Sequence, residues 1–242
     1  VRLRSQVAEI TEDGSCWTLR LGDGTALKAG GIILSIPAFQ AALLTRHLDP
    51  ELSQELEEIP YASSVTVNLA YRREGITHPL DGFGFVVPAN EGRAIIACSF
   101  SSVKFAKRAP VDHVLLRAFA GGALQPQPFD WDDQTLMAAV RRDLNDLLGI
   151  RTAPLWSQVA RHPRSMPQYH VGHLARVAAL EQRLARWPTL KLAGNAYRGI
   201  GIPDSIHSGE QAADALLAEM ASPRRVGLSP PNYSCTERAS LL

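Results

Sequence analysis

The chain has 242 residues, of which 45% are hydrophobic and 20% charged, and 25 Lys and Arg against 24 Asp and Glu give a net charge of +1. This apolar content can offset the conformational entropy lost on folding, so the composition excludes a mainly disordered protein. The balanced charge excludes the basic excess typical of nucleic-acid-binding proteins. No apolar run approaches the roughly 18 residues of a membrane-spanning helix. We therefore expect a soluble, globular chain without nucleic-acid partners.

The residues that most often bind metals are scattered along the chain. Cys16, Cys98 and Cys235 are far apart. Their spacing predicts neither a disulfide framework nor a CxxC metal site, and it is typical of a reducing compartment. His170 and His173 are three residues apart, but no third ligand follows at a recognisable spacing. We expect no metal site.

The N-terminal part of the chain predicts three short strands, one buried strand and two helices. Apolar and polar residues alternate on both sides of Asp23-Gly24, and Asp-Gly between such runs is typical of a hairpin turn. The continuous apolar run at 31–35 predicts a strand that is covered on both faces. One helix is expected after Pro37 and another after Asp49, an N-cap residue followed by proline at the first helical position.

The middle of the chain predicts a sheet followed by helices. From Ser63 the apolar residues recur with a period of two, which indicates a strand with one buried face. Further strands rich in β-branched and aromatic residues are expected at 83–87, 93–100 and 114–120. A helix is expected from Asp133, as its cap, to Gly149. We interpret 156–173 as irregular and expect another helix over 174–186.

Near the C-terminus a short apolar strand leads into a glycine-rich turn at 194–204. The following helix is expected to begin at Ser208, where the sequence matches a capping box. Gly199 and Gly201 could begin a GxGxxG motif, but Asp204 stands where its third glycine would be needed. Spacing alone leaves open whether the turn binds a ligand or only ends a strand.

Five stretches of sequence agree in order and spacing with one family of flavoenzymes. They are DGFGFVVP at 81–88, ACSFSSVKF at 97–105, FAGG at 119–122, MPQYHVGH at 166–173 and LAGNAYRGIGIPDSIHSG at 192–209. Through them, residues 1–220 resemble the oxygen-dependent protoporphyrinogen oxidases of the flavin-containing amine oxidase superfamily. The resemblance implies oxidation of a porphyrinogen, either protoporphyrinogen IX or coproporphyrinogen III, to the porphyrin. It also implies FAD as the cofactor and oxygen as the electron acceptor.

The same resemblance implies a mixed α/β (α+β) fold. We expect the C-terminal half of an FAD-binding Rossmann-like domain, made of a β-meander with the last strand and helix, and a mixed-sheet substrate domain inserted into it. The implied divisions are an FAD-domain portion at 1–60, a substrate-binding portion at 61–185, a return to the FAD domain at 186–221 and a disordered tail at 222–242.

Site residues follow from the resemblance as well. The implied cofactor-binding residues are Val7, on the strand that covers the adenine, and Gly201, Ile202, Pro203 and Asp204, at the flavin. The start of a helix would stabilise negative charge on a reduced flavin. The implied substrate-binding residues are Val86, Ser99, Phe119 and Arg117. Arg117 would meet a propionate or, alternatively, form a surface ion pair. No acid or base is expected, because such enzymes work by holding the substrate carbon against the flavin.

The sequence departs from the family at its beginning. The dinucleotide-binding motif and the membrane-associating region that precede this segment in family members are missing. We therefore interpret the chain as N-terminally truncated and expect it to be colourless and inactive alone. The resemblance further implies a cytoplasmic protein. Peripheral attachment to the inner face of the cell membrane through the missing part, and a homodimer, are left open.

Two alternatives to a porphyrinogen oxidase remain at this point. The chain could be a non-catalytic module that binds tetrapyrroles or other partners. It could also be another superfamily member, such as an amine oxidase or a carotenoid desaturase. Amine oxidases usually have Gly-Glu where this chain has Gly194-Asn195, which argues against them.

Overall fold

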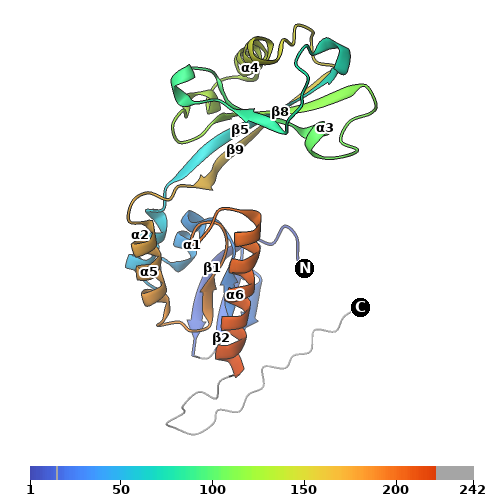
Figure 1. Ribbon diagram of the computed structural model, residues 1–242. Coiled ribbons are helices and arrows are strands. Elements are labelled where there is room, and N and C mark those ends of the chain that lie inside the picture. Colours follow the sequence, from blue (N-terminus) through green and yellow to red (C-terminus); the bar gives the residue numbers. More distant parts are fainter. Residues whose placement is uncertain (15, 222–242) are drawn as a thin grey trace, which may run out of the picture.

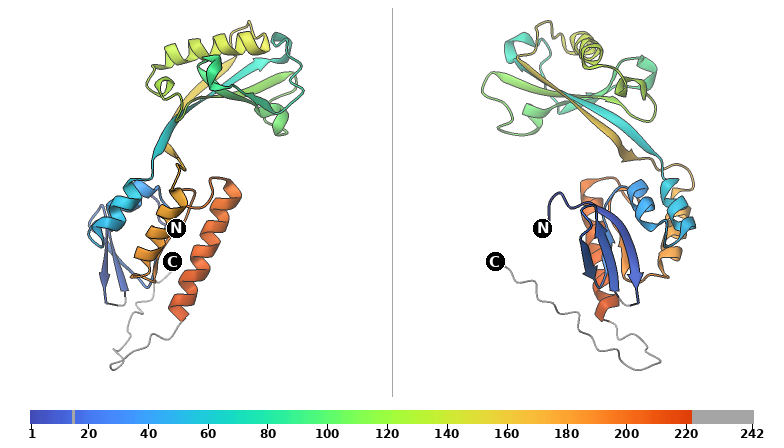
Figure 2. Two further views of the ribbon diagram at one scale, coloured as in Figure 1. Left: turned by 60° about the vertical axis from the view of Figure 1, so that its left-hand side comes forward. Right: turned by 180° about the vertical axis from the view of Figure 1, so that it is seen from behind.

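The protein folds into two lobes that are joined by a pair of long strands (Figure 1). The computed structural model describes residues 1–14 and 16–221. Both ends of the described chain lie in the first lobe, and the segment between them forms the second (Figure 2). The expected α/β fold with an inserted sheet is therefore confirmed, but that sheet was expected to be mixed and its described strands pair only in antiparallel fashion. The disordered tail expected at 222–242 lies outside the described residues.

The first lobe contains an antiparallel sheet and a parallel pair of strands. The antiparallel sheet has the order β1-β2-β3, and β4 pairs with β10 in parallel. These strands are β1 (Val7–Asp13), β2 (Cys16–Leu21), β3 (Ala26–Ala29), β4 (Ile32–Leu34) and β10 (Leu190–Leu192). The turn predicted at Asp23-Gly24 is confirmed, since Gly24 has φ +86° and the Asp23 carboxylate accepts a hydrogen bond from the Thr25 amide at 2.9 Å.

Within the described part of the chain, four helices complete this lobe. They are α1 (Ala38–Thr45), α2 (Pro50–Glu57), α5 (His173–Leu184) and α6 (Ile202–Ala221). Asp49 caps α2 as predicted, because its carboxylate accepts hydrogen bonds from the amides of Glu51 at 2.9 Å and Leu52 at 3.1 Å. The core combines residues from distant parts of the chain. Trp17 is buried there, and its indole N–H donates to the Thr189 hydroxyl at 2.9 Å.

The second lobe is built on a five-stranded antiparallel sheet with the order β6-β7-β8-β5-β9. Its strands are β5 (Tyr61–Arg72), β6 (Gly84–Val86), β7 (Ile95–Phe100), β8 (His113–Gly121) and β9 (Trp156–Pro167). The lobe also contains α3 (Ser101–Lys104), α4 (Asp133–Leu148) and short 3-10 helices at Arg73–Gly75, Ala89–Glu91 and Gln127–Phe129. The strands predicted from 63 to 120 are confirmed.

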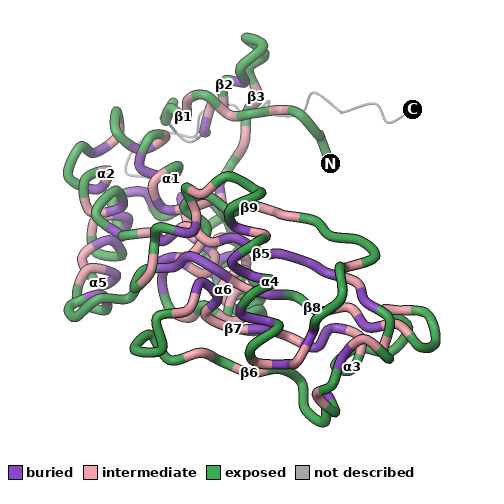
Figure 3. The backbone as a smooth tube through the Cα atoms, turned by 90° about the horizontal axis from the view of Figure 1, so that it is seen from above, coloured by how far each residue is buried: buried purple, intermediate pink, exposed green. Residues whose placement is uncertain are grey.

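The two faces of this sheet differ because side chains alternate along each strand. One face packs against α4, and Val67, Leu116 and Leu144 are among its fully buried residues. Figure 3 shows buried residues along β5, β8 and α4. We call the other side the open face; its residues include Thr66, Asn68, Val86, Ala97, Ser99, Arg117, Phe119, Gln158 and Ala160.

One prediction of secondary structure was wrong in kind. Residues 156–167, which we expected to be irregular, form β9, and that strand pairs with β5 along nearly its whole length. The segment contains Pro163 and few alternating apolar residues, and most of its side chains are exposed. The extended conformation of β9 is therefore determined by its hydrogen bonding to β5, because the strand has no buried apolar face of its own.

Three boundaries also differ from those predicted. α6 begins at Ile202, before Ser208, whose hydroxyl instead accepts a hydrogen bond from the Gly194 amide at 3.0 Å. The N-cap of α4 is Asp132 and not Asp133. We expected the substrate-binding portion to extend to residue 185. The apolar side of α5 packs instead in the core of the first lobe, so this helix belongs with that lobe.

The described residues contain no helix that is both long and apolar enough to cross a bilayer. Within residues 1–14 and 16–221, no three His, Cys, Asp or Glu side chains gather in a way that could hold a metal ion. His173, considered above as a ligand, is buried and hydrogen-bonded to the backbone carbonyl of Tyr197 at 2.9 Å.

Two buried groups in the second lobe should make the protein sensitive to alkali. Burial raises the pKa of the Cys98 thiol and that of the Tyr71 phenol to about 12, from ordinary values of 9.0 and 10.0. Between the ordinary and the raised value the folded protein holds a proton that the unfolded chain has released. The stabilisation is therefore complete below about pH 9 and is lost as the pH rises toward 12.

We expect Cys98→Ala to remove the thiol's share of this dependence. The wild type should lose up to about 1.4 kcal/mol of unfolding free energy per pH unit more than the variant between about pH 9 and 11. Chemical denaturation at a series of pH values measures both slopes. Equal slopes for the two proteins would contradict the prediction, whatever the cavity left by the substitution costs at neutral pH.

Candidate active site

The open face brings together the four substrate-binding residues predicted from the sequence. Val86 lies opposite Ala97 on the neighbouring strand, and Ala97 lies opposite Phe119. Phe119 in turn lies opposite Thr66, which lies opposite Ala160. These five residues form a continuous row across the sheet, which we call the apolar row. Val86 is 80% exposed, so the row presents a flat apolar strip to its surroundings.

A second row runs beside the apolar row and is more polar. It consists of Gly84, Ser99, Arg117, Asn68 and Gln158, each opposite the next. The open face thus places an aromatic and aliphatic strip next to a strip of hydrogen-bonding groups. This arrangement suits a flat apolar ligand with polar substituents at its edge.

Arg117 is the cation of the polar row. Its Nε donates a hydrogen bond to the Asn68 side-chain oxygen at 2.8 Å, and Asn68 is itself buried. Among residues 1–14 and 16–221, Arg117 forms no ion pair, so its alternative role in a surface ion pair is not observed. The ion pairs of arginine in that part of the chain are made by other arginines. The buried amide therefore orients the guanidinium, whose outer nitrogens can still donate to an anion.

The glycine-rich turn leads directly into α6. Gly199 adopts φ +157°, and a Cβ atom there would lie 2.5 Å from the Cβ of Asp204. Only glycine lets the turn come this close to the first helical turn. The Gly201 amide donates to the Asp204 carboxylate at 3.2 Å, which is the contact that an acidic side chain at the third helical position makes with the residue before the helix.

The start of α6 leaves backbone donors free. Within the described residues, no acceptor is found for the N–H groups of Ile202 and Asp204, while Ser205 already donates to the Gly201 carbonyl. Ile202 is 78% exposed. Such N–H groups at a helix start attract oxygen atoms of a ligand. The carboxylate of Asp204 offsets part of the helix dipole there.

The two halves of this candidate site face each other. In Figures 1 and 2, α4 covers the side of the sheet that points away from the first lobe. The open face therefore points toward the end of the first lobe at which α6 begins (Figure 1). Val7 lies apart from both features, in the β1-β2-β3 sheet, where it pairs with Leu21 and packs against the first core.

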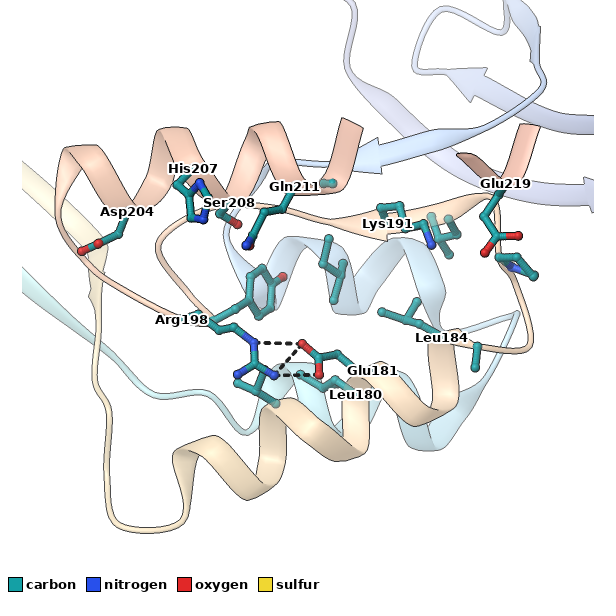
Figure 4. A pocket seen from close by; sticks show the side chains of 17 residues that line it. Leu180, Glu181, Leu184, Lys191, Arg198, Asp204, His207, Ser208, Gln211 and Glu219 are labelled. Atoms are coloured by element: carbon teal, nitrogen blue, oxygen red, sulfur yellow. Dashed lines mark hydrogen bonds and ion pairs between the residues drawn. The ribbon is translucent and has the colours of Figure 1, made fainter. Parts of the chain in front are cut away.

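Sequence reasoning missed a cavity of about 490 Å³ between α5, β10 and α6. Its walls include Leu180, Leu184 and Leu192. Near one end Arg198 and Glu181 form a bidentate ion pair, with Nη2–Oε2 and Nε–Oε1 distances of 2.7 and 3.0 Å (Figure 4). The cavity lies along the flank of α6, and of the predicted cofactor-binding residues only Asp204 lines it.

Sequence reasoning also missed the side chains that are hydrogen-bonded to the glycine-rich turn. Tyr169 bonds the backbone of the turn at two points, and His173 bonds it at a third. Their only sequence signal was their place in the MPQYHVGH stretch, which gave no role for either side chain. Their partners are backbone groups some twenty to thirty residues away, which no local pattern reveals.

Several curated relatives of this chain are porphyrinogen oxidases by name. Among curated proteins, the chain is 34% identical over 219 residues to coproporphyrinogen III oxidase of Bacillus subtilis (strain 168), covering 90% of this chain and 46% of that protein. It is 31% identical over 207 residues to protoporphyrinogen oxidase of Bos taurus, covering 83% of this chain and 43% of that protein. The chain thus spans less than half the length of these relatives.

A solved structure is also similar to this chain. The crystal structure of a "Putative protoporphyrinogen oxidase" from Exiguobacterium sp. 255-15 superposes with a TM-score of 0.77 at 29% identity, covering 90% of this chain and 47% of that one. The family described as flavin containing amine oxidoreductase matches residues 1–217. A flavin is the cofactor that this family implies. With most of its length matched, this chain belongs to the flavin-containing amine oxidoreductases.

Proposed function

We propose that the gene product containing this chain oxidises a porphyrinogen to the porphyrin, with FAD as its cofactor and oxygen as the electron acceptor. We favour coproporphyrinogen III as the substrate. The observation that most supports this function is the open face, on which an apolar row and a polar row lie side by side opposite the start of α6. The family supplies the redox chemistry for which this surface is suited.

The open face would bind the tetrapyrrole. A flat macrocycle gains most by packing on an aromatic ring and neighbouring aliphatic groups, which Phe119, Ala97 and Val86 provide. Its propionates would then reach the polar row. There the Arg117 guanidinium, oriented by the Asn68 amide at 2.8 Å, offers two parallel donors to one carboxylate. Ser99 adds a hydroxyl in the same row.

Two observations favour coproporphyrinogen III over protoporphyrinogen IX. The Bacillus coproporphyrinogen III oxidase is 34% identical to this chain, against 31% for the Bos protoporphyrinogen oxidase. Coproporphyrinogen III also has propionates where protoporphyrinogen IX has vinyl groups. A polar row that crosses the whole sheet is better matched to the substrate with more carboxylates.

The first lobe would hold the cofactor. When bound, FAD supplies a hydride acceptor that oxygen can reoxidise with release of hydrogen peroxide. The free N–H groups of Ile202 and Asp204 would donate to the polar edge of the flavin ring, with Gly201 and Pro203 shaping the approach. Val7, in β1, would lie near the adenine. This chain's part in the reaction is to bind and orient, and we assign no acid or base.

An assay of the complete gene product tests this function. Purified with FAD, it should convert coproporphyrinogen III to the porphyrin in air, with a kcat/KM above that for protoporphyrinogen IX. Porphyrin fluorescence measures the rate. Flavin-dependent oxidation of amines with neither porphyrinogen consumed would contradict the proposal. Binding of coproporphyrin without turnover would instead support a non-catalytic tetrapyrrole-binding module.

Arg117 offers a sharper test of how the substrate lies. Arg117→Ala should raise KM for coproporphyrinogen III about tenfold or more, because a charged hydrogen bond to a carboxylate is lost. kcat should change less, since the residue binds the substrate's edge. Arg117→Lys keeps the charge but not the planar pair of donors, so it should recover only part of the loss.

Arg142→Ala is the matched control, because Arg142 is exposed on α4, on the other side of the sheet. It should behave as the wild type in the same steady-state assay. An unchanged KM for Arg117→Ala, or an equal rise for Arg142→Ala, would argue against a carboxylate bound at the polar row.

A further inference from the structure

One hydroxyl group holds both ends of the segment between Asn195 and Gly199. The Tyr169 O–H donates a hydrogen bond to the Asn195 carbonyl at 2.8 Å and accepts one from the Gly199 amide at 2.9 Å. Burial raises the pKa of this phenol above its ordinary value of 10.0, so at neutral pH it keeps the proton that it donates. The glycine-rich turn is thereby closed across a single oxygen atom.

A second side chain fixes the middle of the same segment. His173 lies flat against the Tyr169 ring, with ring centroids 3.8 Å apart and planes 12° apart. Its Nε2 donates to the Tyr197 carbonyl at 2.9 Å, since a carbonyl oxygen can only accept. The Tyr197 ring is itself buried in the core of the first lobe. Three backbone groups of the turn are thus bonded to the same stacked pair.

This stacked pair follows directly on the strand that reaches up to the open face. β9 ends at Pro167, which pairs with Tyr61, and the Gln168 amide donates to the Pro60 carbonyl at 2.8 Å. Tyr169 is the next residue. Its backbone therefore directly follows the residue that is hydrogen-bonded beside the start of β5, and its hydroxyl is hydrogen-bonded to the turn that leads into α6.

We propose that Tyr169, supported by His173, is a positioning residue that sets the spacing between the open face and the start of α6. The proposal rests on the proposed function, in which one surface holds the porphyrinogen and the other faces the flavin. Hydride transfer needs the two reacting atoms held within narrow limits, and small displacements slow it strongly. A hydrogen-bonded tie from the end of β9 to both ends of the turn provides such a limit.

Removal of the hydroxyl should leave the fold intact. Tyr169 is 39% exposed, so water can replace its hydroxyl at the Asn195 carbonyl and the Gly199 amide. In Tyr169→Phe the ring remains, and so does its stacking on His173. The expected loss is therefore the fixed geometry of the turn and not the core of the lobe.

Hydrogen exchange of the 242-residue chain, without any cofactor, tests the tie itself. In Tyr169→Phe the Gly199 amide should exchange about five to ten times faster, as the loss of one neutral hydrogen bond predicts. Peptides from α2 and from the second lobe should be unchanged. Tyr71→Phe, which removes a phenol from the core of the second lobe, is the matched control and should leave residues 194–201 as in the wild type. Unchanged exchange at Gly199 would overturn the proposal.

Kinetics of the complete gene product test the consequence. Tyr169→Phe should lower kcat for the porphyrinogen on the order of tenfold while the Kd for the porphyrin stays within about twofold, because the residue lies outside the open face. Faster exchange at Gly199 with an unchanged kcat would overturn the positioning role. Absence of porphyrinogen oxidation by the wild type would contradict the proposed function and with it the positioning role. The exchange experiment would still show whether the Tyr169 hydroxyl holds the turn.

Discussion

The pairing of β5 with β9 is the interaction on which both lobes depend. It runs from Tyr61 opposite Pro167 to Ala70 opposite Trp156, so one ladder extends from the edge of the first lobe into the sheet of the second. At its base the Arg164 guanidinium lies 3.8 Å from the centre of the Phe39 ring in α1. The orientation of the open face toward α6 follows from this ladder, since the chain enters and leaves the second lobe through it.

This arrangement divides the proposed site between two surfaces with different physical properties. The sheet offers an extended apolar strip with an oriented cation beside it, whereas the helix start offers free backbone donors. Neither surface needs a titrating side chain for a flavin-dependent oxidation, because the cofactor supplies the chemistry and the protein supplies geometry. The sequence stretch that includes Tyr169 gains a role here, since it connects the two surfaces.

Local rules predicted the parts of the fold that depend on local interactions. The Asp49 cap identified α2, and the alternation that began at Ser63 identified β5 with its buried face. The side on which Phe119 lies was implied only by the resemblance to a family, because local rules favoured a core position for it. β9 was missed because a strand with mostly exposed side chains has no apolar period to detect. α6 was placed too late because Pro203, typical of a first helical turn, followed two glycines and was taken as part of the turn. No local sequence pattern could predict the hydrogen bonds of Tyr169 to distant backbone groups.

The way the lobes alternate along the chain also sets an order of events on the ribosome. The second lobe is continuous from Tyr61 to Pro167, so it can form as soon as β9 has emerged. The first lobe is different, because Trp17 near the beginning packs in one core with Leu190 and Tyr197 near the end. Its early apolar residues lack these core partners until Leu190 and Tyr197 have been translated, so the nascent β1-β2-β3 sheet keeps apolar surface exposed while the second lobe is made.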